Sequence, residues 1–113
     1  MRNNSIRQHR LESLILRSLA DVFQREKNKL SGDGLVSITE VRLSSDLSIV
    51  KVYLSILPTE KREDIYDLIN SQKKFIRKLL GTRIKNVRKI PDLIFFIDDS
   101  YDNMQKIEKL LQE

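Results

Sequence analysis

The chain has 113 residues, 40% hydrophobic and 33% charged, and its 21 basic against 16 acidic residues give a net charge of +5. These values predict one globular domain, 1–113, large enough to bury its own core. The absence of cysteine excludes disulfides, thiolate metal sites and thiol catalysis. The longest apolar run, Leu93–Ile97, is too short to span a membrane, and the first residues lack the apolar segment of a secretory signal. We therefore expect a cytoplasmic protein that does not bind membranes.

The first predicted element is a helix that opens with a capping box at Ser5–Gln8 and runs to about Lys27 or Lys29. Its apolar residues recur at helical spacing, at Leu11, Leu14, Ile15, Leu19, Val22 and Phe23. Its basic start contains Arg2, Arg7, Arg10 and Arg17. Positive charge is not favoured by the dipole at a helix start, so these arginines slightly favour a partner-binding role. The two glycines of Ser31–Gly34 predict the turn that follows.

A β-hairpin is predicted next. Leu35–Leu43 is rich in apolar and β-branched residues, and Ser44–Asp46 has side chains that typically bond their own backbone in turns. Between Val50 and Ile56, apolar residues alternate with their neighbours, which indicates a strand with one buried face. Pro58 ends this strand, and we expect Thr59 to cap the helix that follows.

The central predicted helix follows the Thr59 cap, has Glu63, Asp64 and Asp67 in its first turns, and stops at Gly81. One face is apolar and carries Ile65, Leu68, Ile69, Phe75, Ile76, Leu79 and Leu80. Gln72 interrupts this stripe, and burying its amide without a partner would cost about 1–3 kcal/mol. Either the stripe is open at Gln72, or the helix bends and turns this side chain to water.

The polar side of this helix and the segment after it carry a cluster of positive charge, here named the cationic strip. Its members are Lys73, Lys74, Arg77, Lys78, Arg83, Lys85, Arg88 and Lys89. No acidic residue lies between Asp67 and Asp92, and the rest of the chain is net negative. This concentration predicts contact with a nucleic-acid backbone, extended by Arg2, Arg7 and Arg10. The alternative is a solvated face that maintains solubility.

Leu93–Ile97 is the last predicted strand, and its apolar residues on both faces favour a strand covered on both sides or paired centrally. A final helix is predicted over about Tyr101–Leu111. The order α-β-β-α-β-α predicts an α+β fold with helices packed on one face of a small sheet.

Catalytic and metal-binding patterns are weak. Asp98 and Asp99 are adjacent in an extended segment, where side chains point to opposite sides, so helix capping is favoured over shared acid–base chemistry. His9 is the only histidine, and no glycine-rich phosphate loop is present. We predict no enzyme, no cofactor, no metal site and no small-molecule substrate.

Four segments in order resemble one known family, ribosome-binding factor A. Arg7–Leu11 resembles its first helix, and Ser45–Leu47 with Val50–Leu54 resembles its hairpin. Phe75–Gly81 is similar to the family's helix signature, and Arg88–Ser100 to its closing block. Each segment alone is a weak signal, but together they cover nearly the whole chain.

The resemblance implies a type II KH-like fold, αββααβ with a break between the two middle helices and an additional C-terminal helix. It also implies binding to the free 30S ribosomal subunit and its 16S ribosomal RNA, late maturation of that subunit, ribosomal RNA processing, and a role in cold adaptation. The family usually has Ala-x-Gly at the break, whereas this chain has Gln72-Lys73-Lys74, so we expect a gentler bend at Gln72.

Two other functions remain open from the sequence. One is general binding of messenger or small RNA by a KH domain, which would need a Gly-x-x-Gly loop that this chain lacks. The other is a protein-interaction module whose cationic strip binds an acidic partner. We expect a monomer in each case.

Overall fold

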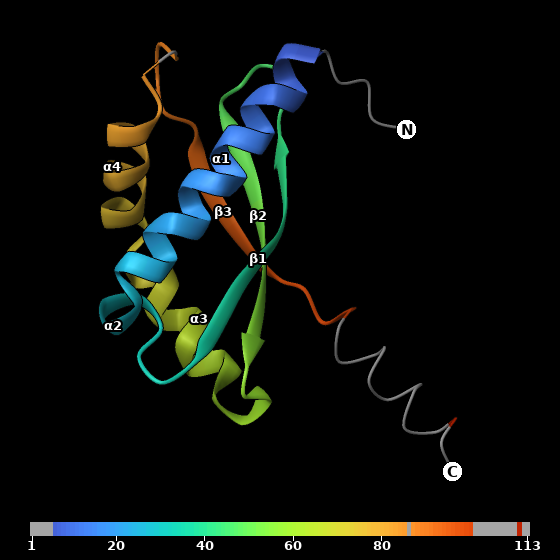
Figure 1. The fold of residues 1–113 in the computed structure, drawn as a ribbon, viewed down its shortest axis with the longest axis vertical. Coiled ribbons are helices and arrows are strands. Elements are labelled where there is room, and N and C mark those ends of the chain that lie inside the picture. The colour runs from blue at the N-terminus through green and yellow to red at the C-terminus, as the bar shows by residue number, and fades with distance from the viewer. Residues whose placement is uncertain (1–5, 86, 101–110, 112–113) are drawn as a thin grey trace.

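The computed structural model of the chain describes residues 6–85, 87–100 and 111 (Figure 1). Its elements in order are α1 (Ile6–Arg25), α2 (Lys27–Leu30), β1 (Leu35–Leu43), β2 (Ile49–Leu57), the 3-10 helix η1 (Thr59–Lys61), α3 (Arg62–Ser71), α4 (Lys73–Arg83) and β3 (Asp92–Ile97). The predicted cap at Ser5 lies outside the described residues, as does the predicted C-terminal helix except for Leu111.

The strands form a three-stranded sheet in the order β1-β2-β3. β1 pairs antiparallel with β2, as predicted for a hairpin, whereas β3 pairs parallel with β2. The prediction that β3 is central or covered on both sides is wrong, because β3 is an edge strand and Phe96 on its outer face is 38% exposed. Its apolar outer residue is explained by stacking instead: the Phe96 and Tyr53 rings lie 5.2 Å apart at 21°.

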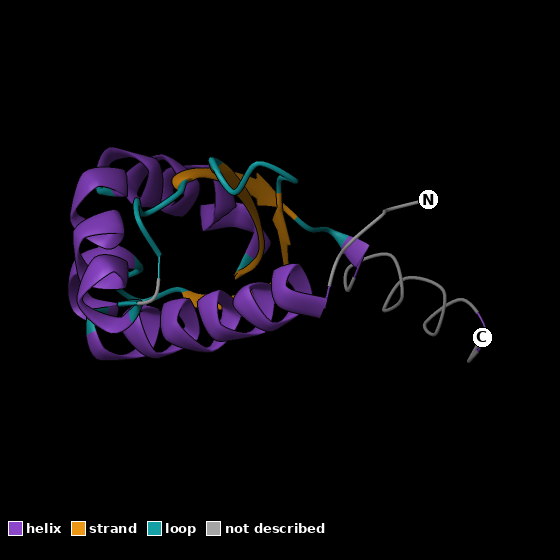
Figure 2. Ribbon diagram, turned by 90° about the horizontal axis from the view of Figure 1, so that it is seen from above, coloured by secondary structure: helices purple, strands orange, loops and turns teal. Residues whose placement is uncertain are grey.

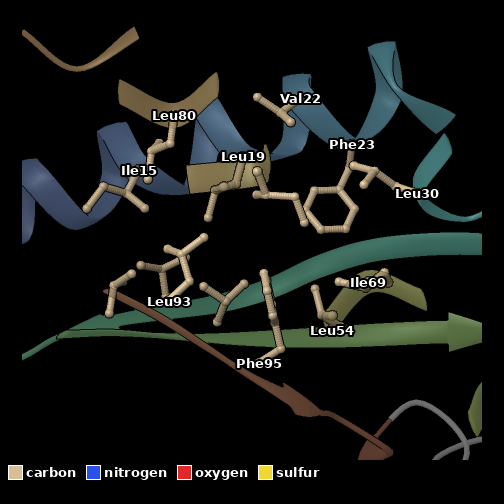
Figure 3. Close-up of a cluster of buried hydrophobic side chains, with 14 of the residues drawn as sticks. Ile15, Leu19, Val22, Phe23, Leu30, Leu54, Ile69, Leu80, Leu93 and Phe95 are labelled. Carbon is tan, nitrogen blue, oxygen red and sulfur yellow. The ribbon is translucent and has the colours of Figure 1, made fainter. Parts of the chain in front are cut away.

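The helices pack on one face of the sheet, which confirms the predicted α+β architecture. In Figure 1, α1 lies across the strands with α4 beside it, and Figure 2 shows the same layers from above. Both layers contribute fully buried side chains to one core, including Ile15, Leu19, Leu54, Leu80 and Phe95 (Figure 3). The order αββααβ, with α2 and η1 as short additions, is the type II KH-like arrangement that the resemblance implies.

The hairpin turn is held by the side chains that predicted it. The Asp46 carboxylate accepts hydrogen bonds from the Ser48 backbone N–H and from the hydroxyl groups of Ser44 and Ser48. The Ser44 hydroxyl also accepts from the backbone N–H groups of Ser48 and Ile49. These bonds lower the pKa of Asp46, those from Ser48 and Ser44 most, so the carboxylate stays charged in the turn.

Two predicted helix boundaries are wrong. Thr59 does not cap the central helix: the 3-10 turn η1 comes first, and α3 begins only at Arg62. Gly81 does not end α4, which continues to Arg83. A Cβ atom at position 81 would lie 3.3 Å from Cγ1 of Ile90, so this glycine allows the segment after α4 to fold back closely against the helix.

The central helix is interrupted at Gln72, as predicted. Gln72 has φ −102° and ψ 13°, outside regular helical geometry, and separates α3 from α4. The backbone remains bonded through the break, since the Gln72 N–H donates to Ile69 and the Ile76 N–H donates to Gln72. The break leaves Gln72 half-buried while Ile69 and Ile76 on either side of it are both fully buried.

Candidate nucleic-acid interface

The fold divides the cationic strip between α4 and the loop after it, which is described at residues 84, 85 and 87–91. Ile76 and Leu80 anchor α4 in the core, so the side chains of Lys74 and Lys78 on its other face are exposed, while Lys73 is half-buried. In the loop, the exposed cations are Lys85, Arg88 and Lys89. Five exposed cations therefore follow one another along a single helix and the loop that extends from it.

The start of α4 adds to the positive potential of this surface. Its first turn contains Lys73 and Lys74 but no acidic residue, and no side chain caps its free amides. A helix start carries partial positive charge from its unpaired N–H groups. An anion such as a phosphate would be stabilised there by both the lysines and the amides.

Arg77 differs from the other members of the strip, because its guanidinium is bonded to the protein itself. Nη2 donates to the carbonyl oxygen of Ile90 at 2.6 Å, and Nε donates to that of Pro91 at 3.2 Å. Nε also lies 3.5 Å from the Asp92 carboxylate. Arg77 thereby connects α4 to the loop and to the start of β3.

Arg83 is bonded to α1. Its Nη1 lies 2.7 Å from Oδ2 of Asp21, which also accepts a hydrogen bond from Nε of Arg25 at 2.9 Å. The Arg83 side chain is 30% exposed, so this ion pair is partly shielded from water. The pair joins the end of α4 to the C-terminal part of α1 and neutralises part of the charge of Arg83.

The structure brings Arg7 and Arg10 of α1 to the loop of the strip. Together with Leu11 and Leu14 of the same helix and Val87 of the loop, they line one surface pocket of about 220 Å³. Arg7 and Arg10 are both exposed. Two of the three arginines predicted to extend the cationic strip, Arg7 and Arg10, thus lie beside its loop. The third, Arg2, lies outside the described residues.

One cation near the break was missed by the sequence analysis. Nζ of Lys29 in α2 lies 3.7 Å from the centroid of the Phe75 ring, which is a cation–π contact. This contact places a further lysine beside the first turn of α4 and covers the ring that the sequence assigned to the apolar face. Helical periodicity could not indicate it, because a turn, two strands, η1 and α3 separate the two residues in the chain.

The carboxylates that the sequence singled out act locally. Asp98 accepts from the Ser100 N–H at 3.0 Å and from the Thr39 hydroxyl at 2.6 Å. Hydrogen bonding by Ser100, and then by Thr39, lowers the pKa of Asp98. The sole histidine, His9, is exposed and its Nδ1 lies 3.6 Å from the Glu12 carboxylate.

Within residues 6–85, 87–100 and 111, no three histidine, aspartate or glutamate side chains are grouped as metal ligands would be. No helix in the same part of the chain has the length and hydropathy needed to cross a membrane. The cationic surface is the candidate site that the described residues present.

Comparison with known proteins points to one family. Residues 7–111 match the family described as ribosome-binding factor A. Ribosome-binding factor A of Cytophaga hutchinsonii is 44% identical over 110 residues, which are 96% of this chain and 83% of that protein. The protein of the same name from Prosthecochloris aestuarii is 39% identical over 111 residues, covering 96% of this chain and 89% of that one.

Solved structures agree with the sequence relatives. The crystal structure of ribosome-binding factor A from Thermus thermophilus is 26% identical, with a TM-score of 0.68 over 80% of this chain and 94% of that one. A homology model of the Thermus thermophilus protein, fitted into a cryo-electron microscopy map of its complex with the 30S subunit, is 26% identical. It superposes with a TM-score of 0.63 over 80% of this chain and 93% of that one.

Proposed function

This chain belongs to the ribosome-binding factor A family, and from this premise we propose that it binds the free 30S ribosomal subunit through 16S ribosomal RNA. We further propose that it assists late maturation of the subunit, including ribosomal RNA processing, and contributes to growth in the cold. In this proposal residues 1–113 act as one monomeric RNA-binding domain in the cytoplasm. The domain works by binding, without catalysis and without a cofactor.

One observation carries the choice of surface: α4 and the loop after it expose five cations, and no acidic residue interrupts the chain between Asp67 and Asp92. RNA phosphates require such a concentration of positive charge. The residues proposed to form the nucleic-acid-binding surface, either by contacting phosphates or by holding the residues that do, are those of the cationic strip and its extension onto α1: Lys73, Lys74, Arg77, Lys78, Arg83, Lys85, Arg88, Lys89, Arg2, Arg7 and Arg10.

The surface is suited to structured RNA. Contacts to phosphates position a protein on a folded RNA without reading individual bases. Binding to unstacked bases would use exposed aromatic rings, but Phe75, the aromatic residue of α4, is half-buried and covered by Lys29. Recognition by shape is therefore favoured over stacking on single strands.

Co-sedimentation in sucrose gradients at moderate salt tests this function. Wild type is expected to migrate with free 30S subunits and not with assembled ribosomes. The double substitution Lys74→Glu and Lys78→Glu is expected to remain at the top of the gradient. Lys51→Glu with Lys61→Glu is a matched control, because it makes the same change in charge at exposed positions outside the strip.

Each outcome has a distinct meaning. Equal binding by both double variants would leave the 30S subunit as the partner and move the contact surface away from α4. Failure of the wild type to bind would reject the 30S subunit as the partner. A competitor such as an acidic protein would then test the alternative that the strip binds an acidic partner.

A further inference from the structure

The loop after α4, described at residues 84, 85 and 87–91, presents three of the exposed cations, and these described residues belong to neither a helix nor a strand. Its direction is set by contacts near its two ends. Ile84 at the start and Pro91 at the end are buried, whereas Lys85, Arg88 and Lys89 between them are exposed. A charged loop of this kind holds its lysines and arginines in one arrangement only if something fixes its backbone.

Arg77 fixes the backbone at the end of this loop. Its guanidinium donates to the carbonyl oxygens of Ile90 and Pro91, and these two bonds use the planar fork that distinguishes arginine from lysine. The Asp92 carboxylate lies on the same guanidinium at 3.5 Å. The Arg77 side chain is only 36% exposed. The two bonds occupy the Nε–Nη2 edge of the guanidinium, so a phosphate could bind that edge only by displacing bonds that hold the loop.

The close packing of Ile90 against Gly81 is a second, independent contact between this face of α4 and the loop. Gly81 lies four residues after Arg77 and therefore on the same face of the helix. The nearest side chain to a Cβ atom built at Gly81 is that of Ile90, at 3.3 Å. One helical face thus bonds the carbonyl oxygen of Ile90 and leaves space for its side chain.

From these contacts we propose that Arg77 is a positioning residue: it holds the loop so that Lys85, Arg88 and Lys89 meet RNA phosphates together, and it does not itself bind a phosphate. This inference rests on the proposed function and assigns Arg77 a different role from its charged neighbours on α4. Lys74 and Lys78 are exposed and point away from the core, as direct phosphate ligands would.

A double-mutant cycle tests the proposal. Arg77→Gln is made in the wild-type chain and in a chain with Lys85→Gln, Arg88→Gln and Lys89→Gln, and the Kd for the 30S subunit is measured at several salt concentrations. If Arg77 acts through the loop, its substitution weakens binding at least about threefold in the wild type and by clearly less in the triple variant. If Arg77 binds a phosphate directly, the loss is equal in both chains, and the proposal is overturned.

Lys78→Gln is the control for this cycle, because Lys78 is an exposed cation on the same helix. Its loss of affinity is expected to be the same in both chains. Its salt dependence, the slope of log K against log salt, is expected to fall by about 0.7–0.9 in both.

Tryptic cleavage of the free protein separates this proposal from the proposed function. The loop contains cleavage sites after Arg88 and Lys89, and release of the loop by Arg77→Gln is expected to speed cutting there, with sites in α1 unaffected. Unchanged cutting would overturn the positioning role, even if the wild type binds the 30S subunit. Faster cutting in a protein that does not bind the subunit would instead reject the proposed function alone.

Arg77→Lys covers the case in which Arg77→Gln does not fold. Lysine keeps the charge but cannot make both bonds to Ile90 and Pro91. Faster loop cleavage and weaker binding in Arg77→Lys support the positioning role, whereas wild-type cleavage and binding overturn it.

Discussion

The Glu12 carboxylate accepts a hydrogen bond of 2.6 Å from the backbone N–H of Leu43, which joins α1 to the end of β1. Gln8, one turn earlier on α1, donates to the carbonyl oxygen of the same residue at 2.7 Å. Gln8, Glu12 and Leu43 are all buried. The helix thereby pairs both backbone groups of Leu43, and the orientation of the α1 arginines depends on this junction.

Glu12→Ala is expected to lower the free energy of unfolding by about 1–3 kcal/mol, because it leaves the buried Leu43 N–H without this acceptor. Glu12→Gln keeps an acceptor oxygen of similar shape and is expected to cost less. Urea unfolding followed by circular dichroism measures both. Equal stability of Glu12→Ala and the wild type would show that the bond contributes nothing.

Gly34→Ala is expected to lower the free energy of unfolding by about 1–3 kcal/mol through overpacking. A Cβ atom there would clash with the Ile65 side chain and would lie 3.2 Å and 3.3 Å from the carbonyl oxygens of Ser31 and Leu57. Gly81→Ala is the milder comparison, because a Cβ atom there meets only the Ile90 side chain, at 3.3 Å, and the gain of up to about 1 kcal/mol in helix propensity offsets part of the cost. Thermal unfolding should therefore show a clearly smaller loss of stability for Gly81→Ala, and equal destabilisation would contradict the prediction.

The Asp98 carboxylate is expected to make stability depend on acid. Its pKa is lowered in the folded protein by hydrogen bonds from Ser100 and Thr39, so its contribution is present above the unfolded pKa of about 4. That contribution is lost as pH falls through the lower, folded pKa. The stability difference between the wild type and Asp98→Asn should therefore be constant near neutral pH and shrink in acid. Urea titrations across this range measure it, and a constant difference would contradict the assignment.

Arg83 and Lys85 are expected to differ in salt dependence although both belong to the cationic strip. Lys85→Gln should lower the slope of log K against log salt for 30S binding by about 0.7–0.9, as the loss of one phosphate contact does. Arg83→Gln should change this slope little, because its guanidinium is paired with Asp21. A similar fall for both variants would show that Arg83 leaves Asp21 to bind RNA.

The sequence predicted the features that depend on local spacing. Alternation in Val50–Ile56 located β2. Gln72 inside an apolar stripe left an open stripe and a bend as alternatives, and the resemblance to the family favoured the bend that separates α3 from α4. The edge position of β3 could not be predicted this way, because the order of strands depends on pairing between distant segments. A buried central strand and an edge strand with a stacked aromatic pair give the same run of apolar residues in a single sequence.

In the candidate site, too, local features could be predicted from the sequence and contacts between distant segments could not. Counting charges identified the cationic strip, but could not separate exposed cations from cations bonded to the protein. Arg83 pairs with Asp21, and Lys29 covers Phe75, across separations that no helical or strand period connects. Arg77 is bonded to backbone carbonyl groups of the loop, and the pattern of side chains in a sequence does not predict such bonds.

The stacked pair of Tyr53 and Phe96 places a fluorescent side chain at the contact between β2 and β3. Tyr53 lies between Val52 and Leu54, both buried under the helices, so its ring is on the opposite face of the sheet. The chain has no tryptophan and three tyrosines. The difference in tyrosine fluorescence between the wild type and Tyr53→Phe can therefore report the pairing of β2 with β3 in the free protein, without a label placed near α4.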